Sequence, residues 1–353
     1  MTAFTTTTPG DSSPDGVTGR PPLTPEAYSE VAAAIEAQVG RVIVGQQDLV
    51  RLVLVCLVCE GHALIEGVPG LGKTVLLKTL AEALSLSFSR LQFTPDLMPA
   101  DIVGTNVLEE DEAGRRQFRY RPGPVFAQLV LADEINRATP KTQSALLEAM
   151  AERAVTVAGE TRRLPRPFLV MATMNPIEME GTYPLPEAQL DRFLLKALVP
   201  FPSAAELAEV VERTTGATHA ALERVADTET LAAMVELTRQ VPVASHLVAH
   251  AVDLVVASHP DGAGAPESVK RYVRVGASPR GAQALVLAAK AAALLDGRPN
   301  VSAADIRAMA RPALRHRLVL GYEATADGVT ADDIVSAVLG AIEEPKPGLR
   351  GAS

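Results

Sequence analysis

The stretch that decides the fold reads Gly67-Val68-Pro69-Gly70-Leu71-Gly72-Lys73-Thr74. It matches the pattern G-x-x-x-x-G-K-[ST], which is typical of a phosphate-binding loop. Residues 62–66 before it predict a short buried strand, and residues 75–84 after it predict a helix. Glycines let backbone N–H groups turn inward, and the start of a helix adds partial positive charge. This order of strand, glycine loop and helix predicts a nucleotide site.

Two side chains of the loop carry specific chemistry. Lys73 can reach the outer phosphates of a nucleotide, and the Thr74 hydroxyl can ligate Mg²⁺. The alternative is a chance glycine turn, which the full motif in this context disfavours. We expect the nucleotide to contact Gly67, Pro69, Gly70, Leu71, Gly72, Lys73, Thr74 and Val75.

A second chemical landmark is the apolar segment 129–132, which ends in Asp133 and Glu134. Ligands gather at the carboxyl ends of parallel strands, so we expect Asp133 to lie beside the phosphate loop and to hold Mg²⁺ directly or through water. Glu134 is the candidate for activating the attacking water. An apolar strand followed by Asp-Glu is weak evidence alone, because exposed turn acids look the same, but it is strong after a phosphate loop.

Two further polar residues are candidates for contacts with the γ-phosphate. The buried strand predicted over 168–175 ends in Asn175, although a simple turn before Pro176 explains that residue equally well. Ser278 and Pro279 predict the start of a helix, which places Arg280 in its first turn. Such an arginine can contact phosphates at a domain interface, or can simply be a surface residue.

Composition narrows the class of protein. The chain has 353 residues, 47% of them apolar and only 4% aromatic, which favours helices and a parallel sheet packed through Leu, Val and Ala. The net charge of −9 argues against a protein that coats nucleic acid or anionic lipid. A nucleic-acid partner is therefore not expected.

Cysteine and histidine patterns suggest no metal centre. Cys56 and Cys59 form a Cys-x-x-Cys within the apolar run 49–59, where two small buried residues are a simpler interpretation than a redox pair or half a metal site. His246, His250 and Asp253 share one helix face, for which a partly solvated surface is the favoured interpretation. The apolar run is too short to span a bilayer and no signal-peptide pattern is visible, so we expect a cytoplasmic protein.

The pattern along the chain predicts two folded domains between two tails. We expect a disordered tail over 1–24, a nucleotide-binding α/β domain over 25–200, a helical lid over 201–345 and a frayed tail over 346–353. Hairpins are predicted over 102–120 and over 154–164 with a turn at Gly159. Expected lid helices cover a segment capped by Ser203, then about 228–240, 243–259, 279–296, 302–315 and 331–342.

These residues in this order resemble an AAA+ ATPase, and three longer strings resemble the MoxR family: 92–97, 133–138 and 181–193. The resemblance runs from about Val39 to Gly321. One small departure is Met174, which stands where the family pattern suggests Gln. The resemblance implies a P-loop AAA+ core with a central parallel sheet, followed by an all-helical lid.

The resemblance also implies roles for individual residues. Lys73 and Thr74 belong to Walker A, Asp133 and Glu134 to Walker B, Asn175 to sensor 1 and Arg280 to sensor 2. Arg192 matches the arginine finger, which acts on the nucleotide of the neighbouring subunit, and Arg137 and Arg153 are weaker candidates for that role. Val44 and Gly45 are expected to contact the nucleotide as well. Segments 102–120 and 154–164 match the helix-2 insert and the pre-sensor hairpin, which would face a ring pore.

The family implies ATP and Mg²⁺ as cofactors, a ring that is usually a hexamer, and a role as a chaperone or maturation factor for protein clients. Its partners often carry a von Willebrand factor A domain. Physical reasoning agrees with a ring, since an arginine supplied in trans typically adds ~10³–10⁵ in rate. The alternatives are a nucleic-acid motor, a nucleotide-gated scaffold or a metal-chelatase subunit on the same fold.

Overall fold

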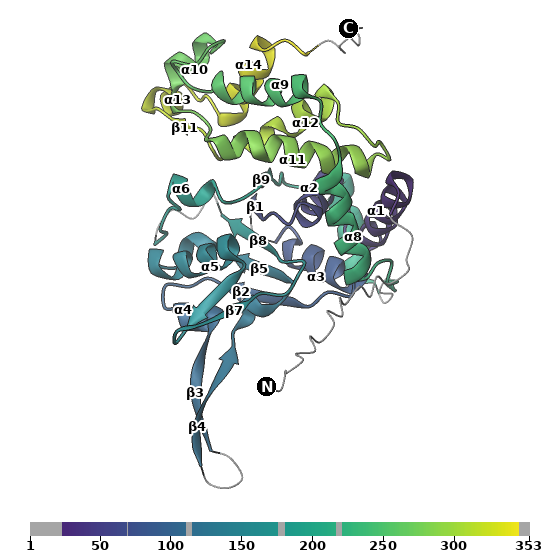
Figure 1. The fold of residues 1–353 in the computed structure, drawn as a ribbon, viewed down its shortest axis with the longest axis vertical. Helices are drawn as coiled ribbons and strands as arrows, with labels where there is room; N and C mark the ends of the chain where they lie inside the picture. The colour runs from purple at the N-terminus through teal and green to yellow at the C-terminus, as the bar shows by residue number, and fades with distance from the viewer. Residues whose placement is uncertain (1–22, 69, 111–114, 176–180, 217–220, 346–353) are drawn as a thin grey trace, which may run out of the picture.

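The computed structural model describes residues 23–68, 70–110, 115–175, 181–216 and 221–345. An α/β body carries a protruding hairpin at one end and a layer of helices at the other (Figure 1). The tails predicted over 1–24 and 346–353 lie almost entirely outside the described residues, so those predictions stay untested. The described part begins at Leu23, and Thr24 caps the first helix by accepting a hydrogen bond from the Ala27 N–H.

The centre of the body is a five-stranded sheet in the order β2-β5-β8-β1-β9, with every neighbouring pair parallel. This confirms the predicted central parallel sheet. Side chains alternate between its two faces: Leu64, Val130 and Ala172 pack on one side, and Ile65 and Leu131 on the other. The strands are β1 (Ala63–Glu66), β2 (Phe88–Gln92), β5 (Leu129–Asp133), β8 (Leu169–Met174) and β9 (Leu195–Leu198).

Helices cover both faces of the sheet, as parallel strands require. One face packs against helices from the first part of the chain, and the other packs against α5, which follows the Asp-Glu strand. Ser85 to Ser87 form the connection from α3 into β2. The body helices are α1 (Pro25–Gly40), α2 (Gln47–Val58), α3 (Lys73–Ala83), α4 (Pro99–Val103), α5 (Pro140–Glu152) and α6 (Glu187–Leu190), with 3₁₀ turns at Pro124–Phe126 and Ile135–Arg137.

Both predicted hairpins are present. The longer one, β3 (Gly104–Glu110) and β4 (Arg116–Pro122), extends far below the body in Figure 1. The shorter one is β6 (Ala154–Val157) and β7 (Glu160–Arg163), with its turn at residues 158–159. The guanidinium of Arg162 lies 4.1 Å from the ring centroid of Tyr120, so the two hairpins contact each other through a cation–π pair.

The C-terminal part forms the predicted helical lid, with one addition; in Figure 1 its helices from residue 245 onward lie above the body, whereas the helix Thr228–Gln240 lies beside it. A short antiparallel pair, β10 (Val273–Val275) and β11 (Val319–Leu320), joins two of its loops, so the lid is not entirely helical. The predicted helix limits agree with the observed ones to within a few residues, but α10 and α13 were not expected. The helices are α8 (Thr228–Gln240), α9 (Ser245–Val256), α10 (Glu267–Tyr272), α11 (Pro279–Leu295), α12 (Ala303–Leu314), α13 (Tyr322–Ala326) and α14 (Ala331–Ala341).

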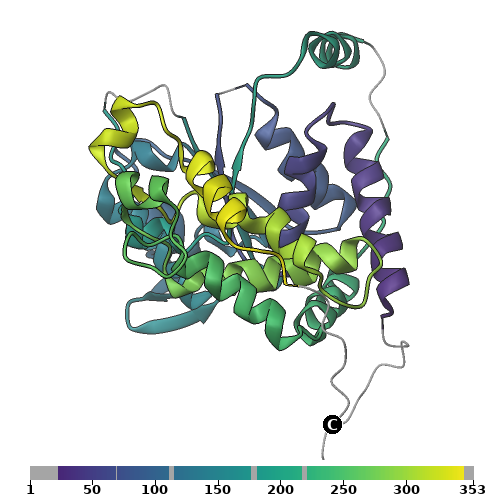
Figure 2. The same cartoon turned by 90° about the horizontal axis from the view of Figure 1, so that it is seen from above.

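The helix that directly follows the sheet, α7 (Ala204–Thr215), lies on the surface of the body. Ser203 caps it as predicted, but none of its residues is buried. Figure 2 shows this teal helix at the edge of the molecule, away from the lid. Arg213 holds it in place by donating to the backbone carbonyls of Gly40 and Arg41, at 3.0 and 3.1 Å.

Neither cysteine nor histidine patterns form a metal centre within the described ranges. Cys56 and Cys59 are free thiols buried in the core, as the simpler interpretation predicts. His246 is exposed, whereas His250 is buried, so the face they share is not fully solvated.

Candidate nucleotide site

The phosphate loop connects β1 to α3 as predicted. Gly70 and Gly72 have φ values of +84° and +74°, in the left-handed region that glycine tolerates best, so the turn depends on them. Lys73 opens α3, and its Nζ donates a 2.6 Å hydrogen bond to the carbonyl of Gly67. Pro69, which we expect to contact the nucleotide, lies outside the described residues.

The Asp-Glu pair lies at the carboxyl end of β5, beside this loop. Asp133 is the last residue of the strand, and Glu134 takes a left-handed conformation with φ +56° that turns the chain away from the sheet. The Glu134 carboxylate accepts hydrogen bonds from Gln92 at 2.7 Å and from Arg137 at 2.9 Å. The Glu134 carboxylate is therefore held in place by two neighbouring side chains.

A single cavity of about 480 Å³ brings the separate motifs together. It is lined by Lys73 and Thr74 of the phosphate loop, by the two acids after β5, and by Asn175 after β8. Three strands that are far apart in sequence thus end at one place, as the sheet-edge rule predicts. The whole lining is Gly67, Gly70, Leu71, Gly72, Lys73, Thr74, Val75, Arg90, Gln92, Asp133, Glu134, Thr173, Met174 and Asn175.

The cavity has a balanced set of charges that suits a metal–polyphosphate ligand. Lys73 and Arg90 supply two cations, and Asp133 and Glu134 supply two carboxylates. Burial lowers the pKa of the Lys73 ammonium, although the nearby carboxylates, Asp133 first, oppose that shift. The Thr74 hydroxyl and the Asp133 carboxylate are hard oxygen donors of the kind that Mg²⁺ prefers.

Four residues of the cavity lining were not among the predicted site residues: Arg90, Gln92, Thr173 and Met174. Arg90 Nη2 donates to Asp133 Oδ2 at 2.7 Å and to Gln92 Oε1 at 2.8 Å. Thr173 is buried between the strands and contacts both Walker B positions. The signal for Gln92 was available, since it ends a strand of the same parallel sheet. Nothing in the pattern indicates that the long Arg90 side chain reaches forward to the same edge.

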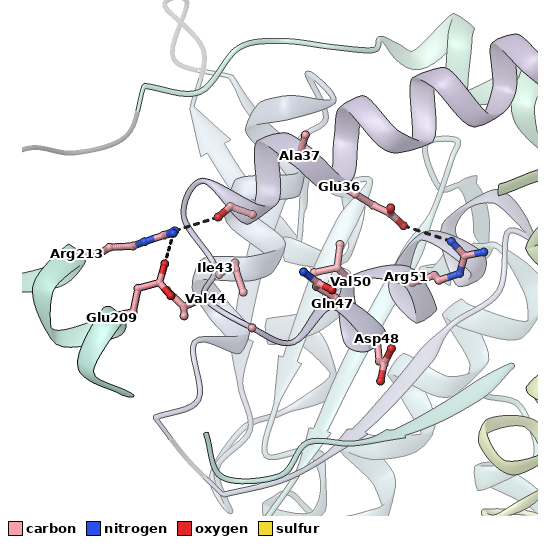
Figure 3. A pocket seen from close by; sticks show the side chains of 12 residues that line it. Glu36, Ala37, Ile43, Val44, Gln47, Asp48, Val50, Arg51, Glu209 and Arg213 are labelled. Atoms are coloured by element: carbon pink, nitrogen blue, oxygen red, sulfur yellow. Dashed lines mark hydrogen bonds and ion pairs between the residues drawn. The ribbon is translucent and has the colours of Figure 1, made fainter. Parts of the chain in front are cut away.

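Val44 and Gly45 line two neighbouring cavities and not the phosphate cavity. The larger, about 630 Å³, lies between α1, α2 and α7. Figure 3 shows Val44 on the loop that joins α1 to α2, with Glu209 and Arg213 of α7 facing it. Gly45 has φ +64°, and a Cβ there would collide with the Glu206 carboxylate of α7.

That loop is nevertheless attached to the phosphate loop. The amide of Gln46 donates a 3.0 Å hydrogen bond to the carbonyl of Leu71. Gln46 itself takes a left-handed conformation immediately before α2. The two predicted nucleotide-contacting segments are therefore fixed relative to each other, although they do not share a cavity.

Arg192 and Arg280 lie together in a different, strongly basic cavity of about 320 Å³. This cavity is lined by five arginines and only two carboxylates: Arg153, Arg192, Arg239, Arg280 and Arg317, with Glu60 and Asp191. Neither Arg192 nor Arg280 lines the phosphate cavity of its own chain. The structure thus brings together the two arginines expected to act on phosphate, but away from Lys73.

Each of these arginines has a defined anchor. Arg192 Nη1 donates to the Leu147 carbonyl on α5 at 2.7 Å, and Arg280 Nη1 lies 3.8 Å from Asp191 Oδ2. The two weaker finger candidates are placed differently. Arg153 is bonded to the buried Glu60, whereas Arg137 is bonded to Glu134 in the phosphate cavity of its own chain.

Comparison with known proteins identifies the architecture. The family model described as "ATPase family associated with various cellular activities (AAA)" matches residues 62–195, and the AAA lid domain model matches residues 266–338. The chaperone MoxR1 of Mycobacterium tuberculosis is 43% identical over 342 residues, covering 96% of this chain and 90% of that protein. This chain belongs to the MoxR family of AAA+ ATPases.

Two further relatives and one solved structure are similar to most of this chain. The uncharacterized protein YeaC of Bacillus subtilis is 43% identical over 90% of this chain and 98% of its own length, and the protein MoxR of Paracoccus denitrificans is 37% identical over 81% and 87%. A crystal structure of a Cytophaga hutchinsonii protein superposes with a TM-score of 0.84 at 37% identity, covering 90% of this chain and 96% of that one.

MoxR membership confirms the predicted core and lid, and it places the chain in a family of nucleotide-binding ATPases. The AAA match runs from just before β1 to the first residue of β9 and therefore contains every residue that lines the phosphate cavity. Among the described residues, no helix has both the length and the apolar character needed to cross a membrane.

Proposed function

We propose that this MoxR protein hydrolyses ATP with Mg²⁺ in the cavity that joins the phosphate loop to the ends of β5 and β8. The observation that carries the proposal is the convergence of Lys73, Thr74, Asp133, Glu134 and Asn175 on one space of about 480 Å³. These side chains come from three separate segments. A cavity of this size holds a triphosphate group, and the residue types around it are those required for phosphoryl transfer.

Each residue has a distinct task in this proposal. Backbone N–H groups of the loop and Lys73 bind the β- and γ-phosphates, and Thr74 with Asp133 holds the metal ion. Mg²⁺ bound there supplies positive charge that offsets the charge of the transferring phosphoryl group. Glu134 orients and deprotonates the attacking water. Asn175, buried at the end of β8, donates to that water or to the γ-phosphate.

The nucleoside end extends toward Val44 and Gly45. Support comes from the Gln46–Leu71 hydrogen bond, which fixes this loop beside the phosphate loop. The cavities on either side of Val44 are bounded by α7 and by residues 198–202. A nucleotide base bound there would contact residues of α7, so this helix would form part of the nucleotide site.

Arg192 and Arg280 act on the nucleotide of a neighbouring subunit in this proposal. Support comes from their shared basic cavity and from their absence from the lining of the phosphate cavity of their own chain. A closed ring places such a surface against the phosphate cavity of the next subunit. We propose a hexamer, in which each site is completed only by assembly.

The work done by hydrolysis is the remodelling of a protein client, with a von Willebrand factor A domain protein as the expected partner. The M. tuberculosis relative is named a chaperone. The longer hairpin exposes Leu108 and Phe118, which suits contact with an unfolded protein segment. Most of its arginines are paired with acids, Arg121 with Glu109 for example, so the hairpin is poorly suited to nucleic acid.

We also propose limits for the two domains and a cellular compartment. We place the division between the AAA+ domain and the lid near residue 200, in the irregular segment that follows β9. Cytoplasmic localisation is consistent with the use of cellular ATP and with two buried, unpaired cysteines.

The decisive experiment compares wild type with Glu134→Gln. The amide keeps an oxygen that can accept from Gln92 and Arg137, but it cannot take a proton from water, so ATP binding should persist while turnover falls by about 100-fold or more. Lys73→Ala should lose binding itself. Unchanged phosphate release by Glu134→Gln would remove Glu134 from the mechanism, and undetectable release by wild type at any protein concentration would contradict the ATPase assignment.

A further inference from the structure

One hydroxyl bridges the two acids at the end of β5, and the residue that bears it has no assigned role. Thr173 lies on β8, two residues before Asn175, and its side chain is buried with 2% exposure. Its Oγ1 accepts a 2.8 Å hydrogen bond from the backbone N–H of Glu134 and donates a 2.7 Å hydrogen bond to Asp133 Oδ1. A single group therefore contacts both Walker B residues.

The direction of these bonds is fixed by chemistry. The Glu134 N–H can only donate and the Asp133 carboxylate can only accept, so the hydroxyl proton points toward Asp133. The last registered pair of the β5–β8 ladder is Ala132 with Ala172. The hydrogen bonds of Thr173 to Asp133 and Glu134 therefore continue the contact between these two strands beyond the ladder. On its other side Thr173 is paired with Ile65 of β1, so the backbone that carries the hydroxyl is held from both sides.

The bond to the Glu134 N–H acts on a strained residue. Glu134 has φ +56° and ψ +50°, a left-handed conformation that costs a non-glycine residue roughly 1–2 kcal/mol. The hydroxyl of Thr173 bonds Oδ1 of Asp133, while Arg90 bonds Oδ2 of the same carboxylate. With one partner on each oxygen, the plane of the carboxylate has a fixed rotation. Both acids thus take their orientation in the phosphate cavity partly from one buried hydroxyl.

We propose that Thr173 is a positioning residue that orients Asp133 toward the metal ion and Glu134 toward the attacking water. This inference rests on the proposed ATPase function and extends it. In this proposal Thr173, although it lines the cavity, acts through the two carboxylates and not through a contact of its own with the nucleotide. Serine retains the hydroxyl, whereas valine has nearly the same shape and removes both hydrogen bonds.

The test uses Thr173→Val, Thr173→Ser and a matched control, Thr238→Val. Thr238 is also fully buried and also bonds a side chain, the Tyr28 hydroxyl at 3.0 Å, but it lies on α8 away from the cavity. For the full-length protein we would measure kcat and KM for ATP, and the affinity for a fluorescent ATP analogue with Mg²⁺ and with EDTA.

Thr173→Val should lower kcat by about 10- to 100-fold, the factor that corresponds to losing a hydrogen bond to a charged group. It should raise the Mg²⁺ concentration for half-maximal binding by about 10-fold while leaving affinity in EDTA within about 2-fold of wild type. Thr173→Ser should stay within about 3-fold of wild type in each quantity.

Two results would overturn the inference. The first is that Thr173→Val and Thr238→Val have the same kcat and need the same Mg²⁺ concentration for half-maximal binding. The other is a Thr173→Val protein that loses affinity in EDTA and melts well below Thr238→Val, since this indicates a packing role. If wild type fails to hydrolyse ATP, the proposed function fails, and the metal-dependent binding measurement still decides the role of Thr173.

Discussion

Arg90 Nη2 lies 2.7 Å from Asp133 Oδ2, so the carboxylate expected to hold Mg²⁺ is paired with a cation from the neighbouring strand. The pair joins β2 to β5 at the sheet edge where the phosphate cavity opens. The Arg90 side chain is about half exposed, at 49%, while Asp133 is at 19%. A metal ion that binds this carboxylate must therefore compete with the guanidinium.

Arg90→Gln should lower the Mg²⁺ requirement of the protein. Pairs this exposed are worth about 0.2–1 kcal/mol, so the half-saturating Mg²⁺ concentration at saturating ATP should fall by at most about 5-fold. A matched control is Arg116→Gln, which removes an exposed pair with Glu110 on the longer hairpin. An unchanged or higher Mg²⁺ requirement in Arg90→Gln would show that Arg90 helps bind the nucleotide and does not compete with the metal.

Mixed assemblies should separate cis from trans arginines. Arg192→Ala alone should lose about 10³-fold or more in turnover, because the transition-state charge lacks a cation. Mixing Arg192→Ala with Glu134→Gln should restore part of the activity. In mixed rings an Arg192→Ala subunit still has Glu134, and a neighbouring Glu134→Gln subunit supplies Arg192 to its site. Arg280→Ala should behave in the same way, because Arg280 shares the basic cavity with Arg192.

Arg137→Ala is the natural control for this mixing experiment. Its guanidinium contacts Glu134 of the same chain, so mixing with Glu134→Gln should give no rescue. Rescue of Arg137→Ala, or a persistent lack of rescue for Arg192→Ala in proteins shown to co-assemble, would contradict the assignment of trans roles.

Acid should destabilise the protein through His62. Its Nδ1 accepts from the Val170 N–H at 3.0 Å and its Nε2 lies 3.2 Å from the Met150 carbonyl, so the buried ring is bonded in its neutral form. Burial lowers its pKa from 6.5 to about 4. Between these values the unfolded chain binds a proton that the folded chain does not, so stability is lost as pH falls through this window.

The expected loss from His62 between pH 7.5 and pH 5 is about 2 kcal/mol in the free energy of unfolding. Urea titrations of His62→Gln should show a correspondingly weaker pH dependence. His246→Gln, at an exposed position of α9, should keep the wild-type dependence. Because His316 is also buried with a lowered pKa and is retained in every variant, only the difference between variants reports on His62. Equal pH dependence in all three proteins would refute the prediction.

Arg317 should be a major stabilising contact between lid and body. Its side chain is 3% exposed and donates to Asp191 Oδ1 at 2.8 Å and to the Phe193 carbonyl at 2.6 Å. Arg317→Met leaves Asp191 partly buried without its main partner, which should cost about 3–5 kcal/mol in urea unfolding.

The control for Arg317 is Arg271→Met, which removes an exposed pair with Asp327 and should cost at most about 1 kcal/mol. Similar losses in the two variants would mean that the buried pair contributes no more than a surface pair. A fall in ATPase activity in Arg317→Met beyond its loss of folded protein is also expected, because Asp191 precedes Arg192.

The parallel sheet, the phosphate cavity and most lid helices were predictable because each depends on local patterns that tertiary packing does not override. Alternating or continuous apolar runs fixed the strands, and the sheet-edge rule then placed Asp133 and Asn175 beside Lys73. The short β10–β11 pair was not predictable, since two and three residues carry no periodicity.

The arginines were the least predictable part of the site. A long side chain reaches several residues from its backbone position, so Arg90 contacts Asp133 from the middle of β2, and sequence spacing does not reveal this. Arg280 was correctly placed in the first turn of its helix, but only the three-dimensional packing of α11 shows that it lies beside Asp191 and Arg192. Thr173 was overlooked because a threonine within an apolar strand is ordinarily read as packing.

The contact between Arg162 and Tyr120 has a mechanical consequence. The shorter hairpin begins where α5 ends, one helix beyond Glu134, while the longer hairpin projects from the far end of the body. Because the Tyr120 ring packs under the Arg162 guanidinium, a tilt of the shorter hairpin should also move the longer one. A rearrangement at the end of α5 should therefore reach the longer hairpin, which lies at the opposite end of the body from the lid.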